Sequence, residues 1–187
     1  MKQPRLKEKY NKNIVPAIKK EFGFKNEIEV PRVTKVVINV GITEEQHQKK
    51  SLENFAEQLK VITGQKPKTT VAKKSIAGFK LRQGDPIGLM VTLRGKRMYQ
   101  FMDKLFSIVM PRIKDFQGIS KDSFDENGNY NLGMEEQIVF PEIEYGKIDQ
   151  VRGLQITFVT NTKDKQIATK LLELMGMPFV KDNNQSK

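Results

Sequence analysis

The side chains best suited to chemistry gather in one basic stretch, residues 65–97. This stretch holds nine Lys or Arg residues and a single acid, Asp85, in a chain of 187 residues whose net charge is +11. Clustered cations neutralise phosphate groups and release their counterions, so the stretch predicts a surface that binds a polyanion. A merely solvated charged face is the alternative, and the glycines and small residues between the bases disfavour it.

Residues for catalysis or metal binding are scarce. The single histidine, His47, lies in a polar run at the start of a predicted helix, where a surface position is more typical than a base or a metal ligand. The chain has no cysteine, which excludes disulfides, thiolate metal sites and cysteine nucleophiles. P-loop, dinucleotide and nucleophile-elbow motifs are lacking, and no helix follows Gly84–Gly88 to make it a phosphate cradle. We therefore expect no enzymatic activity, no cofactor and no metal site.

Two acidic pairs, Glu135–Glu136 and Glu142 with Glu144, lack the spacing of metal ligands. A solvated acidic surface is the simpler interpretation. An acidic surface on a basic protein also suits a protein partner, and both interpretations stay open.

Hydrophobic periodicity predicts the elements that position the basic stretch. Apolar residues at helical spacing predict helices, and alternating apolar residues predict strands. The predicted helices cover residues 4–22, 46–63, 98–110 and 164–175, and the predicted strands cover 33–42, 68–74, 87–94 and 154–161. Residues 115–150 are predicted to be irregular, with a turn at Asp125–Gly128. This order indicates an α+β fold of about four mostly antiparallel strands, with helices packed on one face and the other face open.

No linker or internal repeat divides the chain, so we expect one domain over residues 1–180 and a disordered tail at 181–187. No apolar run reaches the roughly 18–20 residues of a transmembrane helix. The bases at the N-terminus are not followed by the apolar stretch of a secretory signal. These features predict a cytoplasmic protein.

Two strands direct polar side chains to the open face. Alternation turns Ile38 inward and Asn39 outward in the first strand, and it turns Thr92 and Arg94 outward in the strand that ends the basic stretch. An asparagine near a strand end can instead satisfy a local turn, here at Gly41. Residues alone favour that second interpretation of Asn39.

The segment between the second and third strands, residues 75–86, is predicted to be a long, mobile basic loop. Its one aromatic, Phe79, is too little for the stacking platform of a single-strand binder. We therefore expect recognition of folded RNA by shape and backbone contacts.

Eight segments of the sequence give evidence on function beyond the overall composition. They are Val30–Asn39, Thr63–Pro67, Ala72–Ile76, Phe79–Arg82, Gly84–Gly88, Val91–Arg94, Gly128–Gly133 and Glu136–Ile143. In order and in residues they resemble the family of the fifth protein of the large ribosomal subunit, bacterial type. The resemblance covers residues 5–180.

This resemblance implies a structural protein that binds 5S ribosomal RNA in the central protuberance of the large subunit of the cytoplasmic ribosome. The rRNA-binding residues it implies are Asn39, Gln65, Lys66, Thr70, Thr92 and Arg94. The loop at 72–84 would contact peptidyl-site tRNA through Lys73, Lys74, Ser75, Phe79, Lys80 and Arg82. Residues 137–149 would help to bridge to a protein in the head of the small subunit. Further partners are 23S rRNA and neighbouring large-subunit proteins.

Two alternative functions can be distinguished from a structural role in the ribosome. An RNA-modifying enzyme would need a cofactor pocket or an acid–base pair, and the sequence shows neither. A membrane-surface protein would need a basic amphipathic helix with apolar anchors, whereas the charge here is greatest in a loop and a strand. Binding to liposomes without RNA would favour the membrane alternative.

Overall fold

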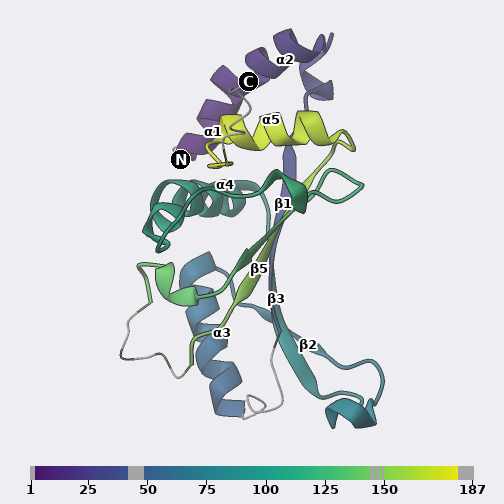
Figure 1. Ribbon diagram of the computed structural model, residues 1–187, viewed down its shortest axis with the longest axis vertical. Coiled ribbons are helices and arrows are strands. Elements are labelled where there is room, and N and C mark those ends of the chain that lie inside the picture. The colour runs from purple at the N-terminus through teal and green to yellow at the C-terminus, as the bar shows by residue number, and fades with distance from the viewer. Residues whose placement is uncertain (1–2, 42–48, 144–145, 147, 149, 181–187) are drawn as a thin grey trace, which may run out of the picture. The chain divides into compact units, whose positions relative to one another are not determined.

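The computed structural model describes residues 3–41, 49–143, 146, 148 and 150–180 (Figure 1). By its internal contacts the chain divides into two compact units. The first comprises Met1–Lys35, Arg94–Asn131 and Phe158–Lys187, and the second comprises Val36–Leu93 and Leu132–Thr157. His47, the predicted helix start at 46–48 and the tail at 181–187 lie outside the described residues.

A five-stranded sheet has the order β2-β3-β1-β5-β4. The strands are β1 (Val33–Gly41), β2 (Lys68–Val71), β3 (Pro86–Leu93), β4 (Tyr130–Met134) and β5 (Leu154–Thr160). β3 pairs antiparallel with both β1 and β2. The predicted α+β class with a mostly antiparallel sheet is confirmed.

The prediction of about four strands was wrong by one, because β4 lies in the stretch expected to be irregular. Asn131 and Gly133 have low strand propensity, and burial of Tyr130, Leu132 and Met134 on alternate positions outweighs it. The predicted turn before β4 is confirmed. There the Asp125 carboxylate accepts hydrogen bonds from the backbone N–H of Asn127 and Asn129.

In the second unit, helix α3 (Lys49–Thr63) contacts β3. Leu52 and Ala56 of its predicted apolar stripe, and Ile87 among the inward residues of β3, are only half-buried. The remaining residues of the stripe and of the inward strand faces are buried, as predicted. These residues are Phe55, Leu59 and Ile62 on the helix and Ile38, Val40, Leu89, Val91 and Leu93 on the strands. Each such side chain stabilises the fold by about 1.5–3 kcal/mol. The inward-facing side of β1 and β3 therefore forms part of the core.

In the first unit, the helix predicted at 4–22 consists of α1 (Arg5–Lys9), a π-helical turn (Tyr10–Ile14) and α2 (Val15–Phe22). The helix predicted at 98–110 is α4 (Gly95–Lys104) followed by a second π-helical turn (Leu105–Val109). Ile108 was predicted to be buried and is 48% exposed. Its neighbours Val109 and Met110 are fully buried, so the apolar stripe continues past Ile108 and leaves that one side chain outside it.

Glycines end three helices as predicted. Gly23 follows α2, Gly64 follows α3, and Gly176 follows α5 (Lys165–Met175), each with a positive φ. At the other end of α5, the Asp164 side chain accepts hydrogen bonds from the backbone N–H of Gln166 and Ile167. The helix boundaries therefore follow from local capping residues.

Candidate nucleic-acid interface

Three strands of the second unit bring polar side chains to one row on the face opposite α3. The register pairs Asn39 of β1 with Met90 of β3, and Met90 with Lys68 of β2. Side chains at paired positions project to the same face, so the three form a row across the sheet. Asn39 and Lys68 are exposed and Met90 is half-buried. Strand alternation therefore leaves this face open, as predicted.

The Asn39 side chain forms no hydrogen bond with any residue that the structure describes, so nothing supports the local-turn interpretation. It lies inside β1, two residues before the strand ends. Both its amide N–H groups and its carbonyl oxygen face solvent and can pair with a ligand. The side chain is thus exposed on the sheet face and makes no hydrogen bond within the described part of the chain.

Gln65 connects the end of α3 to β3. Its Nε2 donates a hydrogen bond to the Thr92 carbonyl oxygen at 3.2 Å. β2 begins at Lys68, opposite Met90, so Thr92 lies beyond the part of β3 that β2 covers. The Gln65 amide therefore takes a strand carbonyl that β2 does not reach. Thr92 itself is half-buried and pairs with Val37 of β1.

Thr70 depends on a glycine across the strand pair. Its partner in the register is Gly88 of β3. A Cβ atom on Gly88 would lie 2.5 Å from the Val40 carbonyl oxygen and 3.0 Å from Thr70 Oγ1. Only glycine leaves room for both oxygens, so Gly88 sets the position of the Thr70 hydroxyl. Lys66, just before β2, and Arg94, just after β3, are exposed.

Residues 72–84 form a hydrogen-bonded hairpin extension, which we call the finger. At its base, Ala72 N–H donates to Asp85 O at 2.8 Å and Gly84 N–H donates to Ala72 O at 3.0 Å. Further out, Ile76 and Leu81 exchange two backbone hydrogen bonds, of 2.9 and 3.1 Å. The segment predicted to be a loop therefore has hydrogen-bonded structure of its own, because its backbone groups pair across the hairpin.

The end of the finger is a 3-10 turn at Ala77–Phe79, followed by Lys80 with φ 48°. Ser75, predicted to contact tRNA, uses its Oγ to accept a hydrogen bond from the Gln83 backbone N–H at 2.9 Å. The single acid of the basic stretch, Asp85, accepts from the Arg82 backbone N–H at 2.7 Å. Both side chains thus hold the finger together.

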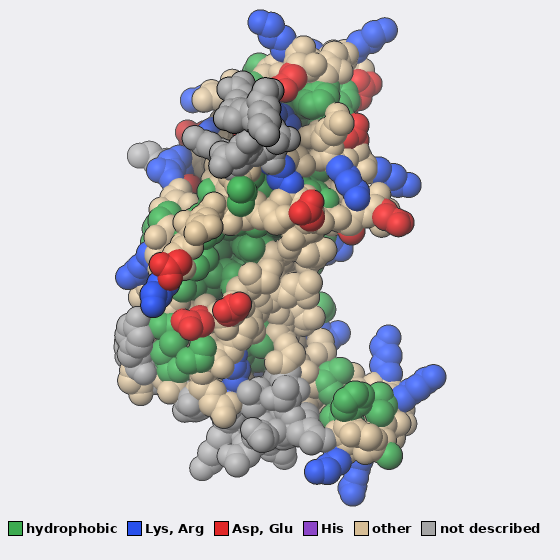
Figure 2. Space-filling model, viewed as in Figure 1, with side chains coloured by type: hydrophobic (Ala, Val, Ile, Leu, Met, Phe, Trp, Pro, Cys, Tyr) green, Lys and Arg blue, Asp and Glu red, His purple; other side chains and the backbone are tan. Residues whose placement is uncertain are grey.

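The five predicted phosphate contacts of the finger, Ser75 and four cations, are all exposed. Lys73, Lys74, Lys80 and Arg82 form no ion pair with any other residue in the described part of the chain. Figure 2 shows Lys and Arg side chains projecting around the end of the β2–β3 hairpin, with hydrophobic side chains between them. The structure therefore groups the predicted tRNA-binding residues on one projection of the second unit.

The segment expected to bridge to a protein partner is partly a structural element. Gln137 is fully buried, donating from Nε2 to Gln150 O at 2.7 Å and accepting from the Arg152 backbone N–H. Arg152 in turn lies over the Phe55 ring of α3, 5.0 Å from its centroid. Gln137 is therefore enclosed in the fold, and Glu144 and Asp149 lie outside the described residues.

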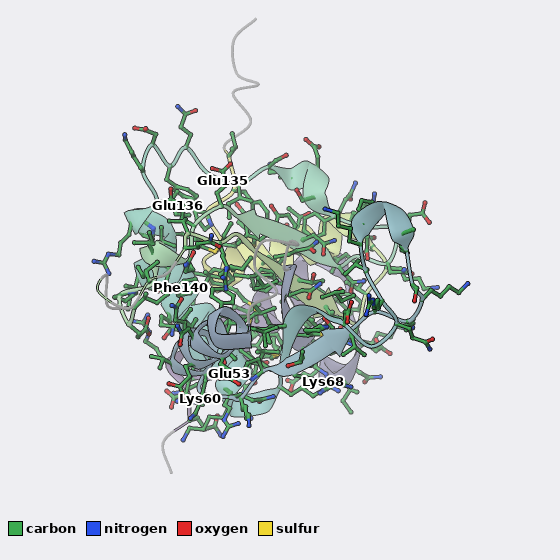
Figure 3. All side chains as sticks on the ribbon, turned by 90° about the horizontal axis from the view of Figure 1, so that it is seen from below. Glu53, Lys60, Lys68, Glu135, Glu136 and Phe140 are labelled. Atoms are coloured by element: carbon green, nitrogen blue, oxygen red, sulfur yellow. The ribbon has the colours of Figure 1, made fainter. Side chains whose placement is uncertain are left out.

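The acidic pair Glu135–Glu136 is exposed, as predicted for a solvated acidic surface. In Figure 3 both side chains lie well away from Lys68, which marks the basic sheet face. This acidic pair is thus separated from the basic sheet face. This separation keeps the acids from competing with an anionic ligand for the bases.

Sequence reasoning left two members of the open face, Lys68 and Met90, out of the predicted site. Both were placed on strands, but only the register shows that they flank Asn39 in one row. Alternation gives the face of each residue within its own strand. It does not give the neighbour across the sheet, which depends on register.

Among the residues that the structure describes, no helix has the length and apolar character needed to cross a membrane.

Comparisons with known proteins show the family of this chain. A family model described as "Ribosomal protein L5" matches residues 26–82, and a second model, which describes the C-terminus of the same ribosomal protein family, matches residues 86–179. A large ribosomal subunit protein uL5 from Thermoanaerobacter sp. (strain X514) is 56% identical, over 95% of this chain and 99% of the relative.

Two further relatives carry the same name. The protein of Carboxydothermus hydrogenoformans is 53% identical over 94% of this chain and 98% of its own length. That of Chloroflexus aurantiacus (strain ATCC 29366 / DSM 635 / J-10-fl) is 55% identical over 94% and 97%. Since two family models together span most of the sequence and these relatives match it almost end to end, the chain belongs to the ribosomal protein L5 family, whose members are structural components of the ribosome and not enzymes.

Proposed function

We propose that the chain is a constituent of the large ribosomal subunit that binds 5S rRNA in the central protuberance through the open face of β1, β2 and β3. The observation that carries the proposal is the register. It aligns Asn39, Met90 and Lys68 in a single row, in which Asn39 and Lys68 are exposed. The bacterial relatives, all named large ribosomal subunit proteins, are consistent with a place in the cytoplasmic ribosome.

Two kinds of contact would bind RNA on this face. Asn39, Thr70 and Thr92 offer amide and hydroxyl groups for bases and riboses, and they would fix the register of the RNA. The cations around them, Lys66, Lys68 and Arg94, would neutralise phosphates. If about five phosphates are neutralised, a coefficient of roughly −0.7 per contact gives a log–log salt slope of about −3 to −4.

The finger would contact peptidyl-site tRNA. Its exposed cations, Lys73, Lys74, Lys80 and Arg82, supply salt-dependent attraction to the tRNA backbone, and Phe79 lies beside them at the tip. Ser75 would act by holding the finger in shape through its bond with Gln83. Because the hairpin continues β2 and β3, its direction is set by the same strands that carry the 5S face.

A third surface would help to bridge to a protein in the head of the small subunit. The buried Gln137 anchors this segment by three hydrogen bonds to Gln150 and Arg152, and exposed acids such as Glu135 and Glu136 lie just before it. Carboxylates on this surface suit a basic protein partner. Contacts with 23S rRNA and neighbouring large-subunit proteins complete the set of proposed partners.

A gel-shift titration tests the 5S proposal directly. The full chain is titrated with 5S rRNA and with an unrelated folded RNA of equal length, at two salt concentrations. Tight binding to 5S rRNA that survives the higher salt, together with loss of the unrelated RNA, is the expected result. Equal, salt-sensitive binding to both would reduce the face to a general polyanion binder and would remove the residue assignments.

A further inference from the structure

The finger ends in an apolar pair that the fold leaves uncovered. Phe79 is 64% exposed and Ile76 is 47% exposed. The two are joined by a turn in which Phe79 N–H donates to Ile76 O at 3.2 Å. In Figure 2 hydrophobic side chains gather at this end of the hairpin. We call Ile76 and Phe79 the apolar tip.

The apolar tip is held by its backbone. Ile76 is fixed by two hydrogen bonds to Leu81, and the 3-10 turn that carries Phe79 closes with Lys80 N–H donating to Ala77 O at 3.0 Å. A ligand that binds the apolar tip therefore contacts side chains whose backbone is already ordered by the turn. Such preorganisation lowers the conformational entropy lost on binding.

The surroundings of the apolar tip select its partner. The finger also carries four exposed cations, Lys73, Lys74, Lys80 and Arg82, and its nearest acid in sequence, Asp85, is engaged with the Arg82 backbone. A hydrophobic protein surface would not match four uncompensated cations. An RNA fold that displays an unstacked base beside its phosphates offers both a flat apolar face and negative charge.

We propose that the apolar tip stacks on an unpaired base of a folded RNA, so that the finger reads an exposed base as well as phosphates. This inference rests on the proposed contact with tRNA and adds a stacking site to it. It also revises the expectation that one aromatic is too little for stacking. Ile76, three residues before Phe79 on the same turn, supplies a second apolar group at the tip.

The chain contains no tryptophan, so Phe79→Trp creates a single fluorescent reporter at the tip. The full-length variant is titrated with labelled deacylated tRNA, and anisotropy gives binding while indole emission reports stacking. A fully base-paired RNA duplex of similar charge and vesicles containing phosphatidylglycerol are parallel ligands. Ile28→Trp is the matched control, because Ile28 is 94% exposed on a turn outside the finger.

We expect tRNA to quench the emission of the Phe79→Trp protein saturably, and the duplex and vesicles to leave it unchanged. The Ile28→Trp protein should show no quenching. Phe79→Ala should weaken tRNA binding about tenfold without changing the salt slope. Lys73→Gln with Lys74→Gln should instead lower that slope by about 1.4–1.8.

Three results would overturn the stacking site alone: bound tRNA without quenching, equal quenching by the duplex, or quenching only by vesicles, which would indicate a membrane contact. In each of these the lysine variants still report whether the finger binds tRNA. If neither the variants nor the parent chain bound tRNA, both the proposed tRNA contact and the stacking site would be wrong.

Discussion

The side chain of Gln65 donates a hydrogen bond from Nε2 to the carbonyl oxygen of Thr92, at 3.2 Å. Two residues expected on one RNA-binding face are therefore in direct contact. Thr92 lies where β2 no longer covers β3, and Gln65 replaces a strand neighbour there. Gln65 thus stabilises the backbone of β3 at the edge of this face.

Gln65→Leu removes this donor while keeping a side chain of similar size. The Thr92 carbonyl then loses a partner, which should lower the free energy of unfolding by about 1 kcal/mol, since a half-buried acceptor is left unpaired. Urea unfolding followed by circular dichroism measures the change. Gln83→Leu, at an exposed glutamine of the finger, is the control and should leave stability unaltered. Equal effects of the two substitutions would show that the Gln65 bond contributes nothing specific.

Asn39→Ala and Thr92→Val should each weaken binding to 5S rRNA by about 1–3 kcal/mol, because each leaves polar groups of the RNA unpaired in the complex. The measurement is the gel-shift titration at fixed salt. Thr69→Val is a matched control, since Thr69 is exposed on β2 but pairs with Leu89 and projects to the other side of the strand. A similar loss of affinity in the Thr69 variant would contradict the assignment of the open face.

The sequence predicts the strands and helices around the site because their apolar residues recur at regular spacing. Leu89, Val91 and Leu93 are buried and Thr92 is not, as alternation requires. Helix ends at Gly23, Gly64 and Gly176 follow from residues that tolerate a positive φ. These features depend on residues that are close together in the chain, so they can be predicted from the sequence.

Other features depend on which residues pair with one another in the fold, and local sequence patterns do not give that pairing. The row of Lys68, Met90 and Asn39 exists only through the register of three strands. Burial of Gln137 depends on Arg152, fifteen residues further along the chain. The hydrogen-bonded finger depends on pairing between Ile76 and Leu81 across a basic, glycine-containing turn. Propensity alone favours a loop at such a turn, and pairing outweighs it.

Gly88→Ala should destabilise the second unit and weaken 5S binding together. The new Cβ atom would lie 2.5 Å from the Val40 carbonyl oxygen, so β1 and β3 must shift apart or Thr70 must move. Overpacking of this kind costs about 1–3 kcal/mol. Thermal unfolding measures the loss, with Gly41→Ala as the control, because nothing lies within 4 Å of its added Cβ. Comparable melting temperatures for the two variants would show that the strands absorb the extra atom.

Tyr10 predicts a pH dependence of stability in the first unit. Its hydroxyl donates to Pro31 O at 3.0 Å, and burial, reinforced by nearby Tyr99, raises the pKa of Tyr10 to about 12. The folded state therefore favours the neutral phenol. This contribution is complete below the ordinary pKa near 10 and is lost as the pH rises from 10 to 12.

Tyr10→Phe should lower the free energy of unfolding by about 1 kcal/mol at pH 7, where only the hydrogen bond is removed. The difference between the parent and Tyr10→Phe should shrink above pH 10, because the phenylalanine cannot ionise in either state. Urea unfolding at pH 7, 10 and 11 measures both effects. A difference that stays constant over this range would mean that Tyr10 titrates alike in the folded and unfolded chains.

Lys73→Glu with Lys74→Glu separates the two proposed RNA surfaces. Both lysines are exposed on the finger, beyond Ala72, whereas the 5S face consists of side chains on β1, β2 and β3. Charge reversal there should repel phosphates near the finger, and screening over about 10 Å at 0.1 M salt limits its effect on a distant surface. We therefore expect 5S affinity to be retained within about twofold, and ribosomes assembled with the variant to hold peptidyl-site tRNA less tightly and translate more slowly. Gel shifts and filter binding of tRNA to ribosomes measure the two properties in parallel. If the double reversal abolished 5S binding instead, the finger would belong to the 5S surface and the division of roles would be wrong.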